Sequence, residues 1–589
     1  MQKSLRKILS LLLTLAMLLS MPLTVMAEEA VVSEEPLPIV EEVAASETTE
    51  SAELPSVEVP VTEEVVIEEV LVEEVPAVEE APVVEAVVSA PVAVLAAVEE
   101  EAELMADPVA MIGEQGYETL NAAIAAALPL LATSAVTIDL VADATLTEAV
   151  EINHGENNLT IQIADSVVGS VTVTASSEAQ LCVAESSVVE IKGKSAAANL
   201  VFDGTGATFA TVTPFLFKGS ANVTLDYVTV QNYTETNDKA APMVTYTSTV
   251  TITNSKFVGN SGSTAGAIRC ADYTSKLYVS DCAFTNNEGA SNAGAIFVYG
   301  ANVDADIIKT TFSGNTTGNG AGAVYVYYDC GLYIQDCTFT GNGGAYGNAI
   351  RIREGEATMK GCTFTNNRGK GRGTVYCGNG GGTDAYTIGE AVLEDCVFSG
   401  NSATATSGGG DIMLWRKGSV TIKGNLTMGA TGESSAKFTN IYMAYTNGSI
   451  IFEGATAEVD TLHIPSIESY DAVAVTVADV AEHGATTLTL NTPAEALRFA
   501  AAGYGINANY DYYATVNDVA ASVADGKFET AVSEDPLLIE VWATKKATSY
   551  VAQVGTGVSA ESYTTLEAAV AAATERGEVT NVYIIDDIT

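Results

Sequence analysis

The stretch DCAFTNNEGASNAGAIFV, residues 281–298, contains the unit that decides the fold. In it a Phe-x-x-Asn motif, a Gly-rich gap and a short apolar run follow one another, and the chain repeats this order six times between Thr251 and Asn425. The six motifs are NSKFVGN (254–260), DCAFTNN (281–287), KTTFSGN (309–315), DCTFTGN (336–342), GCTFTNN (361–367) and DCVFSGN (395–401). Successive phenylalanines are 27, 28, 27, 25 and 34 residues apart. A period of this length indicates stacked units that bury a core only against their neighbours.

Each unit is predicted to be built of strands. In LYVSDCAF (277–284) Leu277 and Val279 alternate with polar residues, and Ser280-Asp281 marks a corner before Cys282 and Phe284 point inward again. No helical stretch is available as a crossover between strands. Parallel strands can then form only if the chain winds as a coil, and crossovers of this kind are right-handed. The apolar runs are AGAIRC (265–270), AGAIFV (293–298), AGAVYV (321–326), GNAIRI (347–352), RGTVYC (372–377) and GGDIML (409–414). The predicted fold class is all-β, a right-handed parallel β-helix.

Successive coils of such a helix lie about 4.8 Å apart, so equivalent side chains stack into columns. The stacked amides can hydrogen-bond to each other, which satisfies buried polar groups. We therefore predict a structural ladder with an aromatic and an amide column: Phe257, Asn260, Phe284, Asn287, Phe312, Asn315, Phe339, Asn342, Phe364, Asn367, Phe398 and Asn401.

Phe-x-x-Asn alternating with AGAI, AGAV or GNAI resembles the FxxN and GGAI repeats of the chlamydial polymorphic membrane protein family, within the pectin-lyase-like β-helix group. The resemblance covers about 175 of the 589 residues. It implies a β-helix solenoid and a secreted or surface passenger domain similar to an adhesin. Many members of the larger group are polysaccharide lyases, hydrolases or epimerases.

The N-terminus predicts export. Residues 1–27 carry Lys3, Arg6 and Lys7, an apolar core and a Val-Met-Ala cleavage site, typical of a signal peptide. The alternative is a membrane anchor, but the apolar run is short for a span, so the mature protein is not expected to cross a membrane. Residues 28–107 are rich in Glu, Val, Pro and Ala and predict a disordered acidic stalk. The acidic run could instead bind Ca²⁺ or a basic partner.

The formal net charge is −49, which excludes nucleic acid and anionic lipid as partners. The sequence makes no prediction of oligomeric state.

The chain contains a second repeat. VAMIGEQGYETLNAAIAAA (109–127) is echoed by VAQVGTGVSAESYTTLEAAVAAA (551–573), and both precede a β run. Residues 108–150 are predicted as a strand–helix–strand cap that closes the N-terminal end of the solenoid, with Thr119 and Thr565 as helix N-caps. Residues 547–589 predict either the start of a second cap and β-helix in a longer protein or a C-terminal cap. The β-helix itself is predicted for 151–465, and terminal coils or a β cap for 466–546.

The cysteines are predicted to lie in the core. One column holds Cys282, Cys337, Cys362 and Cys396, and another holds Cys270 and Cys377. Free thiols and disulfides between neighbouring coils both remain open. A metal site is not expected, because no Cys-x-x-Cys and no His neighbour occurs.

Candidate sites are sparse. No catalytic, metal or cofactor residue is predicted, and His154, His463 and His483 are far apart in sequence. The only dense charged patch of the repeats holds Arg351, Arg353, Glu354, Glu356, Lys370 and Arg372, and it is either an anionic-sugar site or a solvated turn. Outward positions of the apolar runs carry aromatic and basic residues that would stack on sugar rings or contact a protein. Alternatively they stack on each other beneath the Gly-rich loops. The predicted ligand-binding residues are Phe297, Tyr299, Tyr325, Tyr327, Arg351, Arg353 and Tyr376.

These observations predict an exported, non-catalytic cell-surface β-helix protein, an adhesin or display protein that binds glycan or protein. The alternatives are a polysaccharide lyase or hydrolase and a structural spacer of the cell envelope. Fold alone does not separate them.

Overall fold

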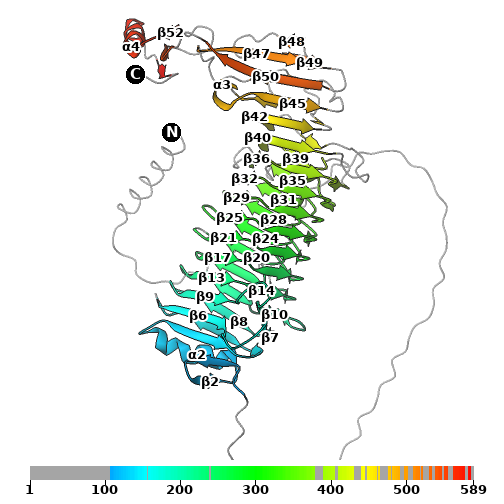
Figure 1. Ribbon diagram of the computed structural model, residues 1–589. Coiled ribbons are helices and arrows are strands. Elements are labelled where there is room, and N and C mark those ends of the chain that lie inside the picture. The colour runs from blue at the N-terminus through cyan, green and yellow to red at the C-terminus, as the bar shows by residue number, and fades with distance from the viewer. Residues whose placement is uncertain are drawn as a thin grey trace, which may run out of the picture. The chain divides into compact units, whose positions relative to one another are not determined.

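The structure is a computed structural model (Figure 1). It describes residues 107–584 apart from 156, 238–240, 273, 379–388, 405–408, 430–439, 445–447, 460–461, 464–474, 479, 491–496, 502–508, 518, 522–528, 533–536, 547–549, 555–560 and 577–580. The predictions of a signal peptide at 1–27 and of an acidic stalk at 28–107 concern residues outside this part of the chain, except for Asp107.

One coil shows the construction of the whole. β21 (Lys276–Ser280), β22 (Ala283–Thr285), β23 (Glu288–Gly289) and β24 (Ile296–Tyr299) follow one another and pair in parallel with the next coil. The next coil holds β25 (Asp304–Ile308), β26 (Thr311–Ser313), β27 (Thr316–Thr317) and β28 (Val324–Tyr327). Figure 1 shows these coils stacked from α2 toward β42. The predicted parallel β-helix is confirmed.

The other coils repeat this arrangement. Strands equivalent to β21 are β3 (Val136–Leu140), β6 (Asn158–Ile163), β9 (Val188–Lys192), β13 (Asn222–Asp226), β17 (Thr249–Thr253), β29 (Gly331–Gln335), β32 (Glu356–Lys360), β36 (Glu390–Glu394), β40 (Ser419–Met428) and β42 (Ser449–Val459). Strands equivalent to β22 are β4 (Ala144–Leu146), β7 (Val171–Ala175), β10 (Leu200–Asp203), β14 (Val228–Gln231), β18 (Lys256–Val258), β30 (Thr338–Thr340), β33 (Thr363–Thr365) and β37 (Val397–Ser399). The regular coils therefore begin well before the six clear motifs, as the sequence predicted.

A twelve-stranded parallel sheet contains β24 and its equivalents. The others are β5 (Ala149–Ile152), β8 (Gln180–Val183), β12 (Phe215–Phe217), β16 (Met243–Tyr246), β20 (Ile268–Ala271), β28, β31 (Gly347–Arg353), β35 (Gly373–Gly378), β39 (Ile412–Trp415), β41 (Ile441–Met443) and β43 (Leu462–His463). Short strands join the corners: β11 (Thr208–Phe209), β15 (Thr234–Glu235), β19 (Ser261–Gly262), β34 (Arg368–Gly369) and β38 (Ser402–Ala403).

The corners explain the third position of the Phe-x-[Gly/Asn]-Asn motif. The residue before each ladder asparagine has a left-handed backbone, with φ of 53° at Asn286, 64° at Gly341 and 54° at Asn366. Gly and Asn adopt this conformation at the lowest cost, so the motif turns the chain there. The earlier corner at Asp281 uses the same device, with φ of 53°.

The predicted phenylalanine column fills the core. From Phe257 to Phe398 consecutive rings stack with centroids 4.9, 5.0, 4.8, 4.9 and 4.6 Å apart and planes within 11° of parallel. Val230 pairs with Phe257 at the head of the column, as predicted. All six rings are no more than 1 % exposed, so the column is the centre of the hydrophobic core.

The asparagine ladder is equally regular. Asn315 Nδ2 donates to Asn342 Oδ1 at 3.0 Å and to the carbonyl of Phe284 at 2.9 Å, and its backbone N–H donates to Asn342 Oδ1 at 3.0 Å. The same three bonds recur from Asn260 to Asn367. The last amide, Asn401, donates to Asp411 Oδ1 at 2.9 Å, and Asn440 donates to the other oxygen of that carboxyl at 2.6 Å.

The carboxyl at this end of the ladder predicts a pH effect. Burial raises the pKa of Asp411 to about 7, although hydrogen bonds from Asn440 and Asn401 act in the opposite direction. The unfolded chain releases this proton near pH 4, so between about pH 4 and 7 the unfolded state binds fewer protons and stability falls as pH rises. We expect this group to lower the free energy of unfolding by roughly 1.4 kcal/mol for each pH unit of increase within that interval.

The measurement is urea denaturation of the parent and of Asp411→Asn from pH 4 to 8. The free energy of unfolding should fall less steeply with pH in Asp411→Asn than in the parent. In Asp395→Asn, which alters an exposed carboxyl of the same coil, it should fall as steeply as in the parent. Equal slopes in all three proteins would contradict the assignment.

A cap closes the first coil, as predicted. β1 (Ala110–Ile112) pairs antiparallel with β2 (Gln115–Tyr117) and with β3, and α2 (Leu120–Leu131) lies between β2 and β3 in sequence. The Thr119 hydroxyl accepts a hydrogen bond from Ala122 N at 3.1 Å, which confirms the N-cap. Leu120, Ile124 and Leu131 are buried in the main core.

The described part of the region 466–546 contains both parallel and antiparallel strands. β44 (Val475–Val477), β45 (Thr486–Leu490) and β46 (Leu497–Ala501) continue the parallel coils, and the short helix α3 (Val480–His483) lies between them. β47 (Tyr510–Val516), β48 (Val519–Ala521), β49 (Glu529–Val532) and β50 (Leu537–Lys545) then pair antiparallel and end the stack. In the described residues, no helix has the length and apolarity that a membrane span needs.

Candidate binding site

The outward residues of the twelve-stranded sheet share one register column, as the sequence predicted. Arg269, Phe297, Tyr325, Arg351 and Tyr376 are aligned partners in successive strands. Three of the rings are buried, because Phe297 is 4 %, Tyr325 2 % and Tyr376 3 % exposed, so the interpretation of this column as an exposed binding surface does not hold for them. The column forms a second apolar layer outside the main core.

The Gly-rich segments cover this layer. Ala265, Ala293 and Ala321 pack on Phe297 and Tyr325 in one cluster. The glycines between them permit the close approach: a Cβ on Gly294 would lie 1.9 Å from the carbonyl oxygen of Gly322. In the structure, therefore, these aromatic residues stack beneath the Gly-rich loops, which is the second of the two predicted alternatives.

A second outward column remains partly accessible. Tyr299, Tyr327, Arg353 and Trp415 stand two positions further along their strands and are half-buried, and Tyr328 beside them is 45 % exposed. The rings of Tyr299 and Tyr327 are 5.6 Å apart, and Arg353 lies 4.5 Å from the Tyr327 ring centroid. Two of the predicted ligand-binding tyrosines thus lie at the surface beside an arginine.

Arg351 is the centre of a cluster of arginines and aromatic rings. Its guanidinium carbon lies 3.8 Å from the ring centroid of Tyr346, 4.7 Å from that of Tyr325 and 5.6 Å from that of Tyr376. Arg372 lies 5.9 Å from the same Tyr346 ring and 4.3 Å from that of Trp415. We call this group the arginine–aromatic cluster: Tyr325, Tyr346, Arg351, Arg353, Arg372, Tyr376 and Trp415.

Two arginine nitrogens of the cluster have no hydrogen-bond acceptor among the described residues. They are the buried Nε of Arg351 and the buried Nη1 of Arg372. Arg351 as a whole is 8 % exposed. A buried guanidinium normally has a carboxylate or carbonyl partner, because leaving a charged donor unsatisfied is costly. The cluster therefore holds buried arginine donors without a partner among the described residues.

A carboxylate beside the cluster is already engaged. Glu354 is 2 % exposed and accepts from Arg353 Nε at 3.4 Å, so the solvated-turn interpretation is wrong for Glu354 and for Arg351. Burial raises the pKa of Glu354, while Arg353 acts in the opposite direction. Glu356 and Lys370 of the predicted patch are exposed. Three arginines and one glutamate leave the cluster formally positive in a chain of net charge −49.

Sequence reasoning missed Tyr346 and Trp415 as members of the cluster. Tyr346 stands in a Gly-rich gap where the preceding repeats carry only small and polar residues. An aromatic residue at this place in the repeat could have marked Tyr346 as a candidate from the sequence. Trp415 aligns with Gly378, Arg353 and Tyr327 in successive strands, which only the register of β28, β31, β35 and β39 reveals.

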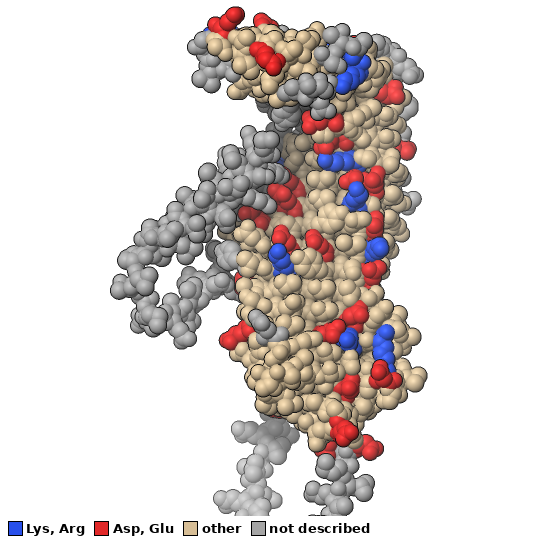
Figure 2. Space-filling model, turned by 60° about the vertical axis from the view of Figure 1, so that its left-hand side comes forward, with Lys and Arg blue, Asp and Glu red and all other residues tan. Residues whose placement is uncertain are grey.

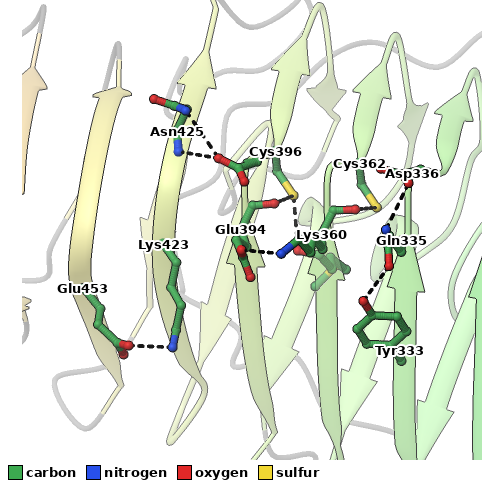
Figure 3. Close-up of polar contacts among 12 residues, drawn as sticks. Tyr333, Gln335, Asp336, Lys360, Cys362, Glu394, Cys396, Lys423, Asn425 and Glu453 are labelled. Carbon is green, nitrogen blue, oxygen red and sulfur yellow. Dashed lines mark hydrogen bonds and ion pairs between the residues drawn. The ribbon is translucent and has the colours of Figure 1, made fainter. Parts of the chain in front are cut away.

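Some charges of the opposite sheet form ion pairs between neighbouring strands. Lys360 bonds Glu394 and Lys423 bonds Glu453, both at 2.6 Å, from neighbouring strands (Figure 3). On the face in Figure 2 the basic residues are scattered singly among acidic ones. Such exposed pairs contribute little to stability.

One carboxyl pair stands out on that sheet. Asp304 and Asp306 lie on the outward face of β25, and Asp306 has Tyr278 and Tyr333 as its partners in the adjacent strands. Burial and the neighbouring Asp304 raise the pKa of Asp306, against a smaller effect of Lys276. Paired carboxyls of this kind are the groups that a glycoside hydrolase would need.

The cysteine columns are confirmed as core. All eight cysteines are buried free thiols, and Cys270 and Cys377 occupy the Val298 column. Burial raises the pKa of Cys282 and of Cys337 to about 12. Cys362 and Cys396 hydrogen-bond to each other and also donate to backbone carbonyls (Figure 3), and this contact raises the pKa of Cys396. The same contact lowers the pKa of Cys362. Cys282 and Cys337 are protonated fillers of the core. No group of three potential metal ligands occurs among the described residues.

The comparisons with known proteins agree with the topology. The family model described as a right handed beta helix region matches residues 294–470. The matched stretch is a right-handed β-helix region. Together with the solenoid topology, this match supports the pectin-lyase-like β-helix group, which includes both enzymes and non-enzymes. No curated protein and no solved structure matches the chain.

Proposed function

We propose that this protein is an exported, non-catalytic β-helix of the cell surface that binds an acidic glycan at the arginine–aromatic cluster. The buried guanidinium of Arg351 carries the proposal, because it lies among three aromatic rings and its Nε has no acceptor in the described part of the chain. The similarity to the polymorphic membrane protein repeats and the N-terminal signal pattern support surface export. The likeness to that repeat family remains a prediction.

The chemistry favours an acidic sugar. A carboxylate or sulfate group would accept from the Arg351 and Arg372 donors, and sugar rings stack on tyrosine and tryptophan faces. The half-buried Arg372 and Trp415 give such a ligand its approach from the surface. A neutral glycan would leave the arginine donors unsatisfied. A protein partner would have to present an acidic side chain in the same place.

Binding of oligogalacturonate tests the proposal. We expect the parent chain to bind oligogalacturonate and not its methyl ester, which has the same rings without the charge. Arg351→Gln should weaken binding about 10-fold or more, because a charge-assisted hydrogen bond is worth about 1.5–3 kcal/mol. Isothermal titration calorimetry gives both affinities. Added salt should weaken binding.

Lys276→Gln is the matched control, since it removes one positive charge from an exposed position on the opposite sheet. It should leave the affinity unchanged. Equal binding of the acid and its ester, or equal losses in the two variants, would contradict the proposal.

The same experiment separates the enzymatic alternatives. Unsaturated product that disappears in Arg351→Gln would indicate a lyase and overturn the non-catalytic proposal. Reducing sugar that disappears in Asp306→Asn would indicate a hydrolase acting at the Asp304–Asp306 pair. No binding of any acidic glycan by the parent would favour the structural spacer.

A further inference from the structure

Residues 551–584 repeat the N-terminal cap in structure as well as in sequence. β51 (Ala552–Val554) pairs antiparallel with β52 (Glu561–Tyr563) and with β53 (Val582–Ile584), as β1 does with β2 and β3. α4 (Leu566–Glu575) lies between β52 and β53 in sequence. The Thr565 hydroxyl accepts from Ala568 N at 3.2 Å, which matches the Thr119 cap of α2.

In the first copy the apolar face of the cap is covered by the β-helix. Ile124 of α2 and Leu140 of β3 are both 0 % exposed. β3 pairs in parallel with β6 of the first coil, and Leu140 is the register partner of Ile163. The occupant of this face is therefore the first coil of a parallel β-helix.

In the second copy the same face is open. Val570 is the equivalent of Ile124 and is 48 % exposed, and Ile584 is the equivalent of Leu140 and is 59 % exposed. The module has a small core of its own around Ala552, Val554 and Ala569. It thus keeps the fold of a cap while its capping residues face solvent. Isolated aliphatic residues at a surface are ordinary, but these two occupy the positions that the first copy buries.

We propose that residues 551–584 form a second β-helix cap, whose open face receives the first coil of another parallel β-helix. The coil would pair in parallel with β53, as β6 pairs with β3, and would bury Val570 and Ile584 under an alternating apolar strand. We infer what covers the face from the N-terminal copy of the cap. Within the described residues, this is the copy whose face is covered, and the first coil of the β-helix covers it. This inference is independent of the proposed glycan binding.

A cap exchange within the full chain tests the proposal. In the chimera, residues 551–584 replace residues 109–140 at the head of the β-helix. We expect cooperative thermal unfolding with a midpoint within about 10 °C of the parent, whereas deletion of residues 109–140 should expose the first coil and lower the midpoint more. A chimera no more stable than the deletion variant would overturn the proposal.

Val570→Asp supplies the matched comparison. The substitution should lower the midpoint of the chimera by more than about 10 °C, because there it buries a charge against the first coil. In the parent it should leave the midpoint unchanged, because the residue is exposed. Equal effects in the two backgrounds would contradict the equivalence of Val570 and Ile124.

Sedimentation of the parent gives a measurement that does not depend on the chimera. A parent chain that dimerises, and becomes monomeric with Val570→Asp, would show that a second copy covers the face, and would overturn the proposal. A monomeric parent that binds a hydrophobic dye, with less dye bound by Val570→Asp, would support an open capping face.

Discussion

Replacing Phe398 with Ala should lower the free energy of unfolding of the β-helix by about 4 kcal/mol. The ring is fully buried, stacks on Phe364 at 4.6 Å with planes 11° from parallel, and faces Met428 in the next coil. Neighbouring coils are fixed by their backbone ladders, so they cannot close the cavity that the missing ring leaves. Urea denaturation followed by circular dichroism gives the change.

Val397→Ala is the control for this substitution. Val397 precedes Phe398 on the same strand, points to the opposite face and is 41 % exposed. Its truncation should change stability by less than about 0.5 kcal/mol. Losses of similar size in the two variants would refute the assignment of the phenylalanine column as the core.

Replacing Asn367 with Ala should cost on the order of 5 kcal/mol. The side chain accepts from Asn342 N and Asn342 Nδ2, both at 3.0 Å, and donates to Asn401 Oδ1 at 3.0 Å and to the Phe339 carbonyl at 2.9 Å. Alanine leaves the backbone N–H of Asn342 and the carbonyl of Phe339 without these bonds, whereas Asn401 Oδ1 still accepts from the backbone N–H of residue 367. Each unsatisfied buried group costs about 1–3 kcal/mol. The loss exceeds that of a single hydrogen bond because the ladder breaks on both sides.

Asn366→Gly provides the comparison on the adjacent residue. Asn366 is exposed and has a left-handed backbone with φ of 54°, which glycine adopts without strain. The loss should stay below about 1 kcal/mol. A loss in Asn367→Ala no larger than in Asn366→Gly would show that water replaces the ladder bonds.

The arginine–aromatic cluster coincides with the place where the repeat departs from its own pattern. The apolar runs before it read AGAI or AGAV, whereas those that carry Arg351 and Tyr376 read GNAIRI and RGTVYC. The Phe-to-Phe steps change there as well, to 25 and 34 residues. A regular solenoid needs neither change for stability, and a sequence that breaks its local rule at one place is expected to do so for function.

The sequence by itself determined the solenoid, the phenylalanine and asparagine columns, the direction of each side chain and both helix caps. The alternation of side chains along a strand tells whether each residue points into the core or outward. The repeat of about 27 residues tells which residues lie above and below it in the adjacent coils. These are local and periodic properties, so they can be read without coordinates. The tertiary structure alone decided what covers the outside.

Tyr325 and Arg351 point outward as predicted but lie beneath Gly-rich segments, because glycines such as Gly294 let one backbone approach another. Whether Arg351 Nε finds an acceptor depends on every chain segment that passes near it, and none of the described segments supplies one. Likewise, Ile124 and Val570 occupy equivalent positions in two similar sequences, and only the presence of a coil beside one of them makes their exposures differ. The burial of an outward-pointing residue depends on which other segments pack over it, and the periodicity of its own strand does not tell which segments these are.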